Sequence, residues 1–223
     1  MKTAAVIFDM DGVIFDSERM YIECYKEIAD KYHVDNVEEV CYKCVGVTSE
    51  KTVRILKDYY GEDFPVDEYY AEAGKIFKEK YEKNGLPMKP GVRELLSFLK
   101  ENGIKTALAS STKTEVVKTE LGDAGILGFF DEIVGGDMVQ RSKPDPDIFL
   151  KAAEALGLSP EEVMVIEDSF NGIRAAYAAG MKAVMVPDLL QPDEEIRSKA
   201  YRVEKSLLDV RDYLSTGIAA AGL

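Results

Sequence analysis

The sequence predicts an α/β fold built on a parallel sheet, and three observations lead to that prediction. Short apolar runs that end in polar or small residues recur along the chain, as expected for strands buried on both faces. Amphipathic helical patterns separate these runs, and such alternation is typical of βαβ units. One stretch, rich in Tyr and charged residues, holds only helical patterns and interrupts the alternation. We therefore expect a parallel-sheet core with a helical insertion.

Five segments are expected to form the strands. The first, Ala4 to Phe8, is an unbroken apolar run that ends in Asp9. The same pattern returns at residues 104–109, 132–134, 163–166 and 183–186. Continuous rather than alternating apolar character indicates strands that are covered by helices on both faces of the sheet.

The helical patterns between the strands have start and stop signals. Residues 92–101 follow a Pro-Gly pair and stop at Asn-Gly, while residues 114–121, 147–156 and 169–179 each stop at a glycine. Residues 159–162, Ser-Pro-Glu-Glu, form a capping box that opens a short turn before the fourth strand. Residues 191–214 hold two further short helical patterns.

The insertion follows the first strand. Residues 17–84 show amphipathic helical patterns at 18–32, 49–60 and 67–83, and residues 84–91 contain the two glycines and two prolines of a semi-rigid linker. We expect residues 1–16 and 85–223 to form a catalytic core and residues 17–84 to form a helical cap domain.

The net charge and the lengths of the apolar runs indicate which kinds of binding partner the protein can have. The 28 Lys and Arg residues against 41 Asp and Glu give a net charge of −13, which repels nucleic acids and anionic membranes. The first residues run into a strand-like segment, so we expect no signal peptide, and the apolar runs are far shorter than the ~20 residues of a membrane span. We expect no nucleic-acid or membrane partner, and a monomer or weak oligomer.

The three cysteines provide no disulfide framework, so a reduced compartment, the cytoplasm, fits the sequence best. Cys41 and Cys44 have the spacing of half a zinc site or of a redox pair. No second Cys or His pair completes a metal site, and we favour the simpler interpretation that the two residues share one buried face of a helix.

Polar residues follow the strands at the points where the strands end. In an open parallel sheet, ligands bind beyond the carboxyl ends of the strands, so residues far apart in sequence are expected to meet at that edge. The candidates are Asp9, Asp11, Ser110, Ser111, Lys143, Glu167 and Asp168.

The chemistry of these residue types points to phosphoryl transfer with a metal ion. Carboxylates gathered at one edge repel each other unless a divalent cation lies among them, and hard oxygen ligands suit Mg²⁺. An ordinary aspartate has a pKa of about 3.9, so Asp9 is expected to be ionised and able to attack a phosphate ester. Mg²⁺ and Lys143 would neutralise the repulsion between the two anions, and Ser110 would donate to the phosphate.

Together these residues resemble the four motifs of the haloacid dehalogenase superfamily, in the same order. The motifs are residues 9–13 (Asp-Met-Asp-Gly-Val), Ser110, residues 143–146 (Lys-Pro-Asp-Pro) and residues 167–169 (Glu-Asp-Ser). The resemblance covers roughly residues 4–212 and extends to the helical-cap subgroup that includes β-phosphoglucomutase and sugar-phosphate phosphatases. It implies a Rossmann-like parallel-sheet core with the cap domain inserted after the first strand.

The resemblance also implies a role for each matching position. Asp9 would form an aspartyl-phosphate, and Asp11 would protonate the leaving oxygen and then activate water. Ser110, Ser111 and Lys143 would bind the phosphate or substrate. The Mg²⁺ ligands would be Asp9, Asp11 through its main-chain carbonyl, Asp168, and Glu167 directly or through water.

Departures from the family pattern favour one reaction over others. Dehalogenases and phosphonatases of the family lack the second motif-one aspartate, so the presence of Asp11 disfavours both activities. The mutase loop carries a Lys before its Gly and an Arg three residues after it, whereas here Val45 precedes Gly46 and Ser49 lies three residues after it. Tyr21 stands at the position of the mutase histidine. We favour a phosphatase acting on a small phosphorylated metabolite, such as a sugar phosphate. A phosphosugar mutase and a non-catalytic ligand-binding member remain the alternatives.

Overall fold

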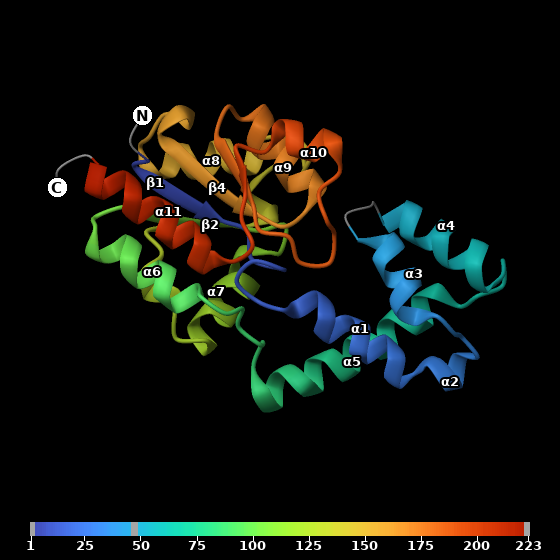
Figure 1. Ribbon diagram of the computed structural model, residues 1–223. Helices are drawn as coiled ribbons and strands as arrows, with labels where there is room; N and C mark the ends of the chain where they lie inside the picture. The colour runs from blue at the N-terminus through green and yellow to red at the C-terminus, as the bar shows by residue number, and fades with distance from the viewer. Residues whose placement is uncertain (1–2, 46–48, 221–223) are drawn as a thin grey trace. The chain divides into compact units, whose positions relative to one another are not determined.

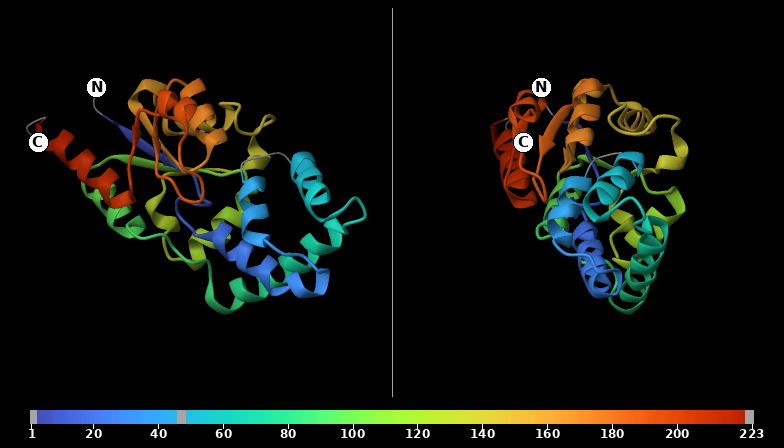
Figure 2. Two further views of the ribbon diagram at one scale, coloured as in Figure 1. Left: turned by 45° about the vertical axis from the view of Figure 1, so that its right-hand side comes forward. Right: turned by 90° about the vertical axis from the view of Figure 1, so that its right-hand side faces the viewer.

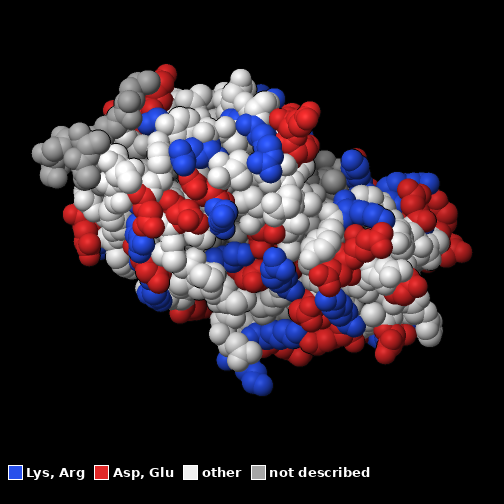
Figure 3. All heavy atoms as spheres, in the orientation of Figure 1, with Lys and Arg blue, Asp and Glu red and all other residues white. Residues whose placement is uncertain are grey.

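A computed structural model of the chain describes residues 3–45 and 49–220. The chain divides into two compact units, which we call the core unit (Met1–Phe15 with Met88–Leu223) and the helical unit (Asp16–Pro87). No helix in the described ranges is both long and apolar enough to cross a membrane. Acidic and basic side chains are interspersed over the face that Figure 3 shows.

The core unit is built on one six-stranded parallel sheet, in the order β3-β2-β1-β4-β5-β6 (Figure 1). The strands are β1 (Ala5–Phe8), β2 (Lys105–Ala109), β3 (Glu132–Val134), β4 (Val163–Glu167), β5 (Lys182–Met185) and β6 (Arg202–Val203). The α/β fold class predicted from the sequence is confirmed. The sequence did not indicate β6, because two residues are too few to display a strand pattern.

Helices cover both faces of this sheet (Figures 1 and 2). They are α6 (Val92–Glu101), α7 (Thr114–Asp123), α8 (Asp147–Leu156), α9 (Phe170–Ala178), α10 (Glu194–Lys199) and α11 (Leu207–Ala220). Helices α8 and α9 pack on one face, and α6 packs against β2 on the other with α11 beside it. Single 3₁₀ turns lie at Leu127–Phe129, Gly136–Met138 and Pro160–Glu162, the last with the predicted capping box.

The central position of β1 in the sheet explains why its sequence is continuously apolar and does not alternate with polar residues. Ala5 and Ile7 belong to the core cluster formed with α8 and α9, while Val6 and Phe8 point to the opposite face and are also fully buried. Because both faces of β1 are covered, every one of its side chains is removed from water.

The helical unit consists of α1 (Ser17–Glu27), α2 (Ala29–Tyr32), α3 (Val37–Cys44), α4 (Ser49–Tyr60) and α5 (Val66–Asn84). The single helix predicted for residues 18–32 breaks at Ile28, and α2 ends at His33, whose backbone is left-handed (φ 53°). Stacked and edge-on rings of Tyr25, Tyr32, Phe64 and Tyr69 form much of its core.

The cysteines of the helical unit are all free thiols. Cys41 and Cys44 lie on α3 and are half-buried, so the face they share is only partly covered. The loop around Gly46, on which the comparison with the mutase pattern depends, lies outside the described residues.

Candidate active site

The strand register places the polar residues at one level of the sheet. Phe8, the last residue of β1, pairs with Leu108 on one side and Ile166 on the other. The next residue, Asp9, donates its backbone N–H to the Ile166 carbonyl at 3.0 Å. Asp9 therefore lies beside Glu167, the last residue of β4, and beside the end of β2, which Ser110 follows.

Lys143, from the loop after β3, joins two of the carboxylates. Its ammonium group donates to Asp9 Oδ1 and, at 2.8 Å, to Glu167 Oε1. The Ala109 carbonyl accepts a third hydrogen bond at 3.3 Å. The side chain of Lys143 is 8% exposed, so it forms two buried ion pairs, and all three residues come from predicted motifs.

Glu167 is held on its other oxygen by the start of α9. The backbone N–H groups of Asp168 and Ser169 donate to Glu167 Oε2 at 2.9 and 2.8 Å. Ser169 caps α9, as predicted, by accepting from the Gly172 N–H at 3.0 Å. At Gly172 a Cβ atom would lie 1.7 Å from Glu167 Oε1, so only glycine leaves room for this carboxylate.

The loop after β1 turns closely against Asp168. Gly12 adopts φ +79°, in the left-handed region that favours glycine, and its N–H donates to the Phe15 carbonyl at 2.8 Å. A Cβ atom on Gly12 would lie 2.2 Å from Asp168 Oδ2. The first and fourth motifs are thus packed directly against each other.

Three of these carboxylates could hold a divalent cation. Oxygens of Asp9, Glu167 and Asp168 lie within 4.8 Å of one another, and all three residues are buried. When all three carboxylates are ionised, one Lys143 ammonium leaves two negative charges to be balanced, and hard oxygen donors suit Mg²⁺. The donor set therefore fits the predicted ion. Asp11 lies in the same loop, half-buried, and is not among these three.

The protonation of Asp9 differs from the sequence expectation. Burial raises the pKa of Asp9 to about 8; the Lys143 charge opposes this rise, and the Glu167 and Asp11 charges add to it. An ordinary aspartate pKa was expected because the sequence does not report desolvation. Burial alone would lower the pKa of Lys143, but the charges of Asp9 and Glu167 raise it, so this lysine stays charged.

The loop after β2 places a hydroxyl at the same edge. Ser110 is buried, and its Oγ accepts from the Thr112 N–H at 3.1 Å, so its own hydrogen can be donated elsewhere. Ser111 is exposed, and its carbonyl oxygen would lie 2.2 Å from a Cβ atom on Gly136. The loops after β2 and β3 are therefore in close contact at this edge.

One acidic residue near this edge was missed by sequence reasoning. Burial raises the pKa of Glu120, on α7, to about 7, with the charges of Asp11 and Asp123 acting in the same direction. Glu120 Oε2 is buried and accepts no hydrogen bond. The sequence carried no signal for this residue, because a glutamate in an amphipathic helix normally faces solvent.

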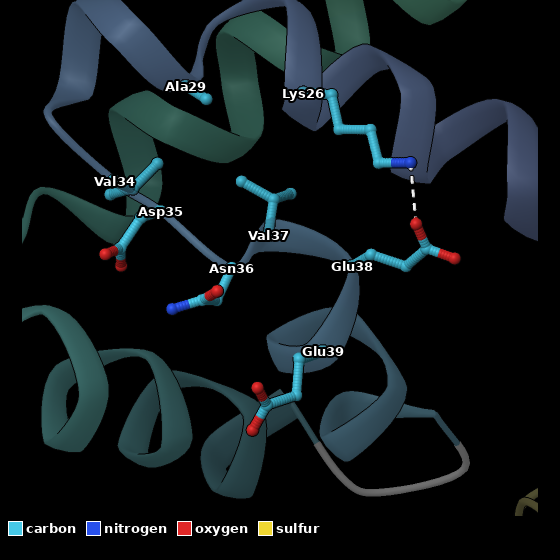
Figure 4. Close-up of a pocket in the computed structure, with 8 residues that line it drawn as sticks. All are labelled: Lys26, Ala29, Val34, Asp35, Asn36, Val37, Glu38 and Glu39. Carbon is cyan, nitrogen blue, oxygen red and sulfur yellow. Dashed lines mark hydrogen bonds and ion pairs between the residues drawn. The ribbon is translucent and has the colours of Figure 1, made fainter.

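A pocket of about 400 Å³ in the helical unit is a poor candidate for binding a phosphate ester (Figure 4). Its charged lining residues are three carboxylates, Asp35, Glu38 and Glu39, and one lysine, Lys26. Lys26 is already paired with Glu38 at 2.8 Å. The excess of negative charge would repel an anionic ligand.

Comparison with known proteins gives consistent matches. The sequence pattern of the family described as haloacid dehalogenase-like hydrolase matches residues 6–186. A phosphorylated carbohydrates phosphatase from Thermotoga maritima is 36% identical over 184 residues, which are 81% of this chain and 83% of that protein.

Among the solved structures that are similar, two cover most of the chain. The β-phosphoglucomutase of Clostridium difficile has a TM-score of 0.70 and 27% identity, covering 98% of this chain and all of that one. CbbY from Rhodobacter sphaeroides, in complex with phosphate, has a TM-score of 0.71 and 25% identity, covering 93% and 96% of the two chains.

Proposed function

Because the chain belongs to the haloacid dehalogenase-like hydrolase family, we propose that it is a Mg²⁺-dependent phosphatase that hydrolyses a small phosphorylated metabolite, specifically a sugar phosphate. The family membership and the enzyme class predicted from the four motifs, a phosphoric monoester hydrolase, are confirmed by the comparisons. The observation that carries the finer proposal is the buried contact of Lys143 with both Asp9 and Glu167 at the strand ends.

The proposed reaction has two steps. A carboxylate oxygen of Asp9 attacks phosphorus, and the ester oxygen leaves with a proton from Asp11, which gives an aspartyl-phosphate and the free alcohol. Asp11, now ionised, takes a proton from water, and the hydroxide attacks the phosphorus of the aspartyl-phosphate. Inorganic phosphate leaves, and Asp9 is restored as a carboxylate.

The remaining residues would balance the negative charges of Asp9 and of the bound phosphate. Lys143 offsets the repulsion between Asp9 and an incoming phosphate, and Ser110 donates its hydroxyl to a phosphate oxygen. Asp9, Glu167 and Asp168 would hold Mg²⁺, together with Asp11 through its main-chain carbonyl. The bound cation would supply positive charge that favours the ionised form of Asp9 and stabilises the phosphoryl oxygens in the transition state.

We extend the proposal to the organisation of the chain. Residues 1–16 and 85–223 form the catalytic domain and residues 17–84 the cap domain, a division supported by the two compact units. Location in the cytoplasm, a monomeric or weakly associated state and the lack of a nucleic-acid partner stay predictions from composition.

The test compares the wild type with Asp9→Asn on an aryl phosphate and on a panel of sugar phosphates, with Mg²⁺ and with EDTA. We expect Mg²⁺-dependent phosphate release from the wild type and none above background from Asp9→Asn, because an amide is a poor nucleophile. Full activity in Asp9→Asn, or equal activity in EDTA, would contradict the proposal.

A phosphosugar mutase is the second candidate, supported by the similarity to the Clostridium difficile β-phosphoglucomutase. Product analysis on hexose 1-phosphates in Mg²⁺ separates the two reactions. Free phosphate as the main product supports the phosphatase, and isomerised hexose phosphate supports the mutase.

A further inference from the structure

A second lysine–carboxylate pair lies at the same edge of the core sheet. Lys89 Nζ is 2.7 Å from Asp188 Oδ1, and the Asp188 side chain is only 2% exposed. Asp188 lies in the segment that leaves β5, after Val186 and Pro187, whereas Asp9 and Asp168 come directly after β1 and β4. None of the four motifs includes either member of this pair.

Both partners are fixed to backbone that carries the proposed active site. The Lys89 N–H donates to the Ile14 carbonyl at 2.9 Å, and Met88 forms an antiparallel bridge with Phe15. Lys89 is thereby joined to the loop that contains Asp9 and Asp11. On the other side, the Val186 N–H donates to the Glu167 carbonyl at 2.8 Å, which ties the segment leading to Asp188 to the end of β4.

The Asp188 carboxylate also approaches a proposed metal ligand. One of its oxygens lies within 4.8 Å of an oxygen of Asp168. Two buried carboxylates at this separation repel each other, so the arrangement is unfavourable unless positive charge is close to both. Lys89 supplies such a charge to Asp188, and the proposed Mg²⁺ would supply one to Asp168.

We propose that Lys89 and Asp188 form a positioning pair for the Mg²⁺ site. Asp188 adds negative charge behind Asp168 and strengthens the attraction for the cation, while Lys89 holds the Asp188 carboxylate in place. This inference rests on the proposed function, since it assumes that Asp168 is a metal ligand. Partners that surround the ligands of a metal commonly change its affinity by about ten- to a hundredfold.

A purely structural role is the competing explanation, and it predicts different behaviour. A buried ion pair can often be replaced by two uncharged side chains without loss of stability, whereas removal of one partner leaves a buried charge. Asp188→Asn alone should therefore destabilise the core unit whatever the role of the pair. The double variant Lys89→Met/Asp188→Asn removes both charges and should recover most of that stability.

The experiment is calorimetric titration of metal-stripped protein with MgCl₂, combined with urea denaturation in EDTA. We expect Asp188→Asn to weaken Mg²⁺ binding about tenfold. The double variant should regain stability but keep the weakened binding. Glu195→Gln, which breaks the peripheral pair of Glu195 with Arg174, is the matched control and should bind Mg²⁺ like the wild type.

The outcomes separate this inference from the proposed function. Wild-type Mg²⁺ affinity in the double variant would overturn the positioning role and leave the phosphatase proposal intact. If the wild type itself fails to bind Mg²⁺ and turns over phosphate esters equally in EDTA, the metal dependence and the positioning role are both refuted.

Discussion

Replacement of Gly172 by alanine tests whether the start of α9 determines the position of Glu167. The added methyl group would lie 1.7 Å from Glu167 Oε1 and 2.5 Å from Oε2, far inside van der Waals contact. Glu167 is 1% exposed and its neighbours are packed, so its carboxylate must leave its present place rather than bend aside. It would then lose its hydrogen bonds to Lys143 and to two backbone N–H groups.

The size of the effect follows from these contacts. A hydrogen bond to a charged group contributes roughly 1.5 kcal/mol or more, so three of them correspond to about 4–5 kcal/mol. Alanine is favoured over glycine inside a helix by about 1 kcal/mol, which offsets part of the loss. We expect Gly172→Ala to lower the free energy of unfolding by about 3–4 kcal/mol and to weaken Mg²⁺ binding.

Urea denaturation followed by circular dichroism measures this change, and the chain offers a matched control. Gly122 also lies in a helix of the core unit, and a Cβ atom there would meet nothing within 4 Å. Gly122→Ala should therefore be neutral or stabilising. A Gly172→Ala protein as stable as Gly122→Ala, with unchanged Mg²⁺ affinity, would refute the reasoning.

A double variant shows whether Glu167 is the cause. In the Glu167→Ala background the carboxylate that collides with the new methyl group is gone. Adding Gly172→Ala to that background should therefore cost almost nothing, because effects of residues in direct contact are not additive. Additive losses would place the strain elsewhere in α9.

Three further predictions concern charge and backbone at the same edge. Lys143→Met leaves Asp9 and Glu167 as buried carboxylates without their ammonium, so the free energy of unfolding in EDTA should fall by about 3–5 kcal/mol, with partial recovery in Mg²⁺ measurable by thermal denaturation. The pKa of Glu120 is raised in the folded protein, so the native state retains a proton that the unfolded state loses, and stability decreases as the pH rises from about 5 through about 7. Glu120→Gln should remove this decrease and be more stable than the wild type at pH 8, by about 1 kcal/mol after allowance for its partial exposure; a parallel pH dependence in both proteins contradicts the assignment. Gly12→Ala combines a left-handed backbone with a contact of 2.2 Å to Asp168, so it should lower kcat at saturating Mg²⁺ and raise the Mg²⁺ concentration needed for half-activity, and unchanged values of both would refute the close packing of this loop.

Much of the core unit could be predicted from the sequence because its signals are local. Runs such as Ala4 to Phe8 report burial on both faces, and the bounds expected for residues 92–101 and 147–156 coincide with α6 and α8 because Gly or Pro marks their ends. The convergence of Asp9, Lys143 and Glu167 followed from a general property of parallel sheets, that strand ends share one edge.

The remainder depends on tertiary contacts that no local pattern records. The break at Ile28 lies inside a helical pattern that continues on both sides of it. The raised pKa of Asp9 results from desolvation by the folded core, and the pairing of Lys89 with Asp188 joins two loops from distant parts of the sequence. Such features become visible only when the backbone places the residues together.

The position of β1 in the sheet has a consequence for biosynthesis. Ala5 pairs with Lys105 of β2 on one side and with Val163 of β4 on the other. β1 is therefore synthesised well before the two strands with which it pairs. Until the ribosome has released β4, the most apolar strand of the chain cannot be fully covered, and Asp9 cannot meet Glu167. Assembly of the proposed active site must therefore be a late event in synthesis, and nascent chains that stall before β4 expose β1 to chaperones and to aggregation.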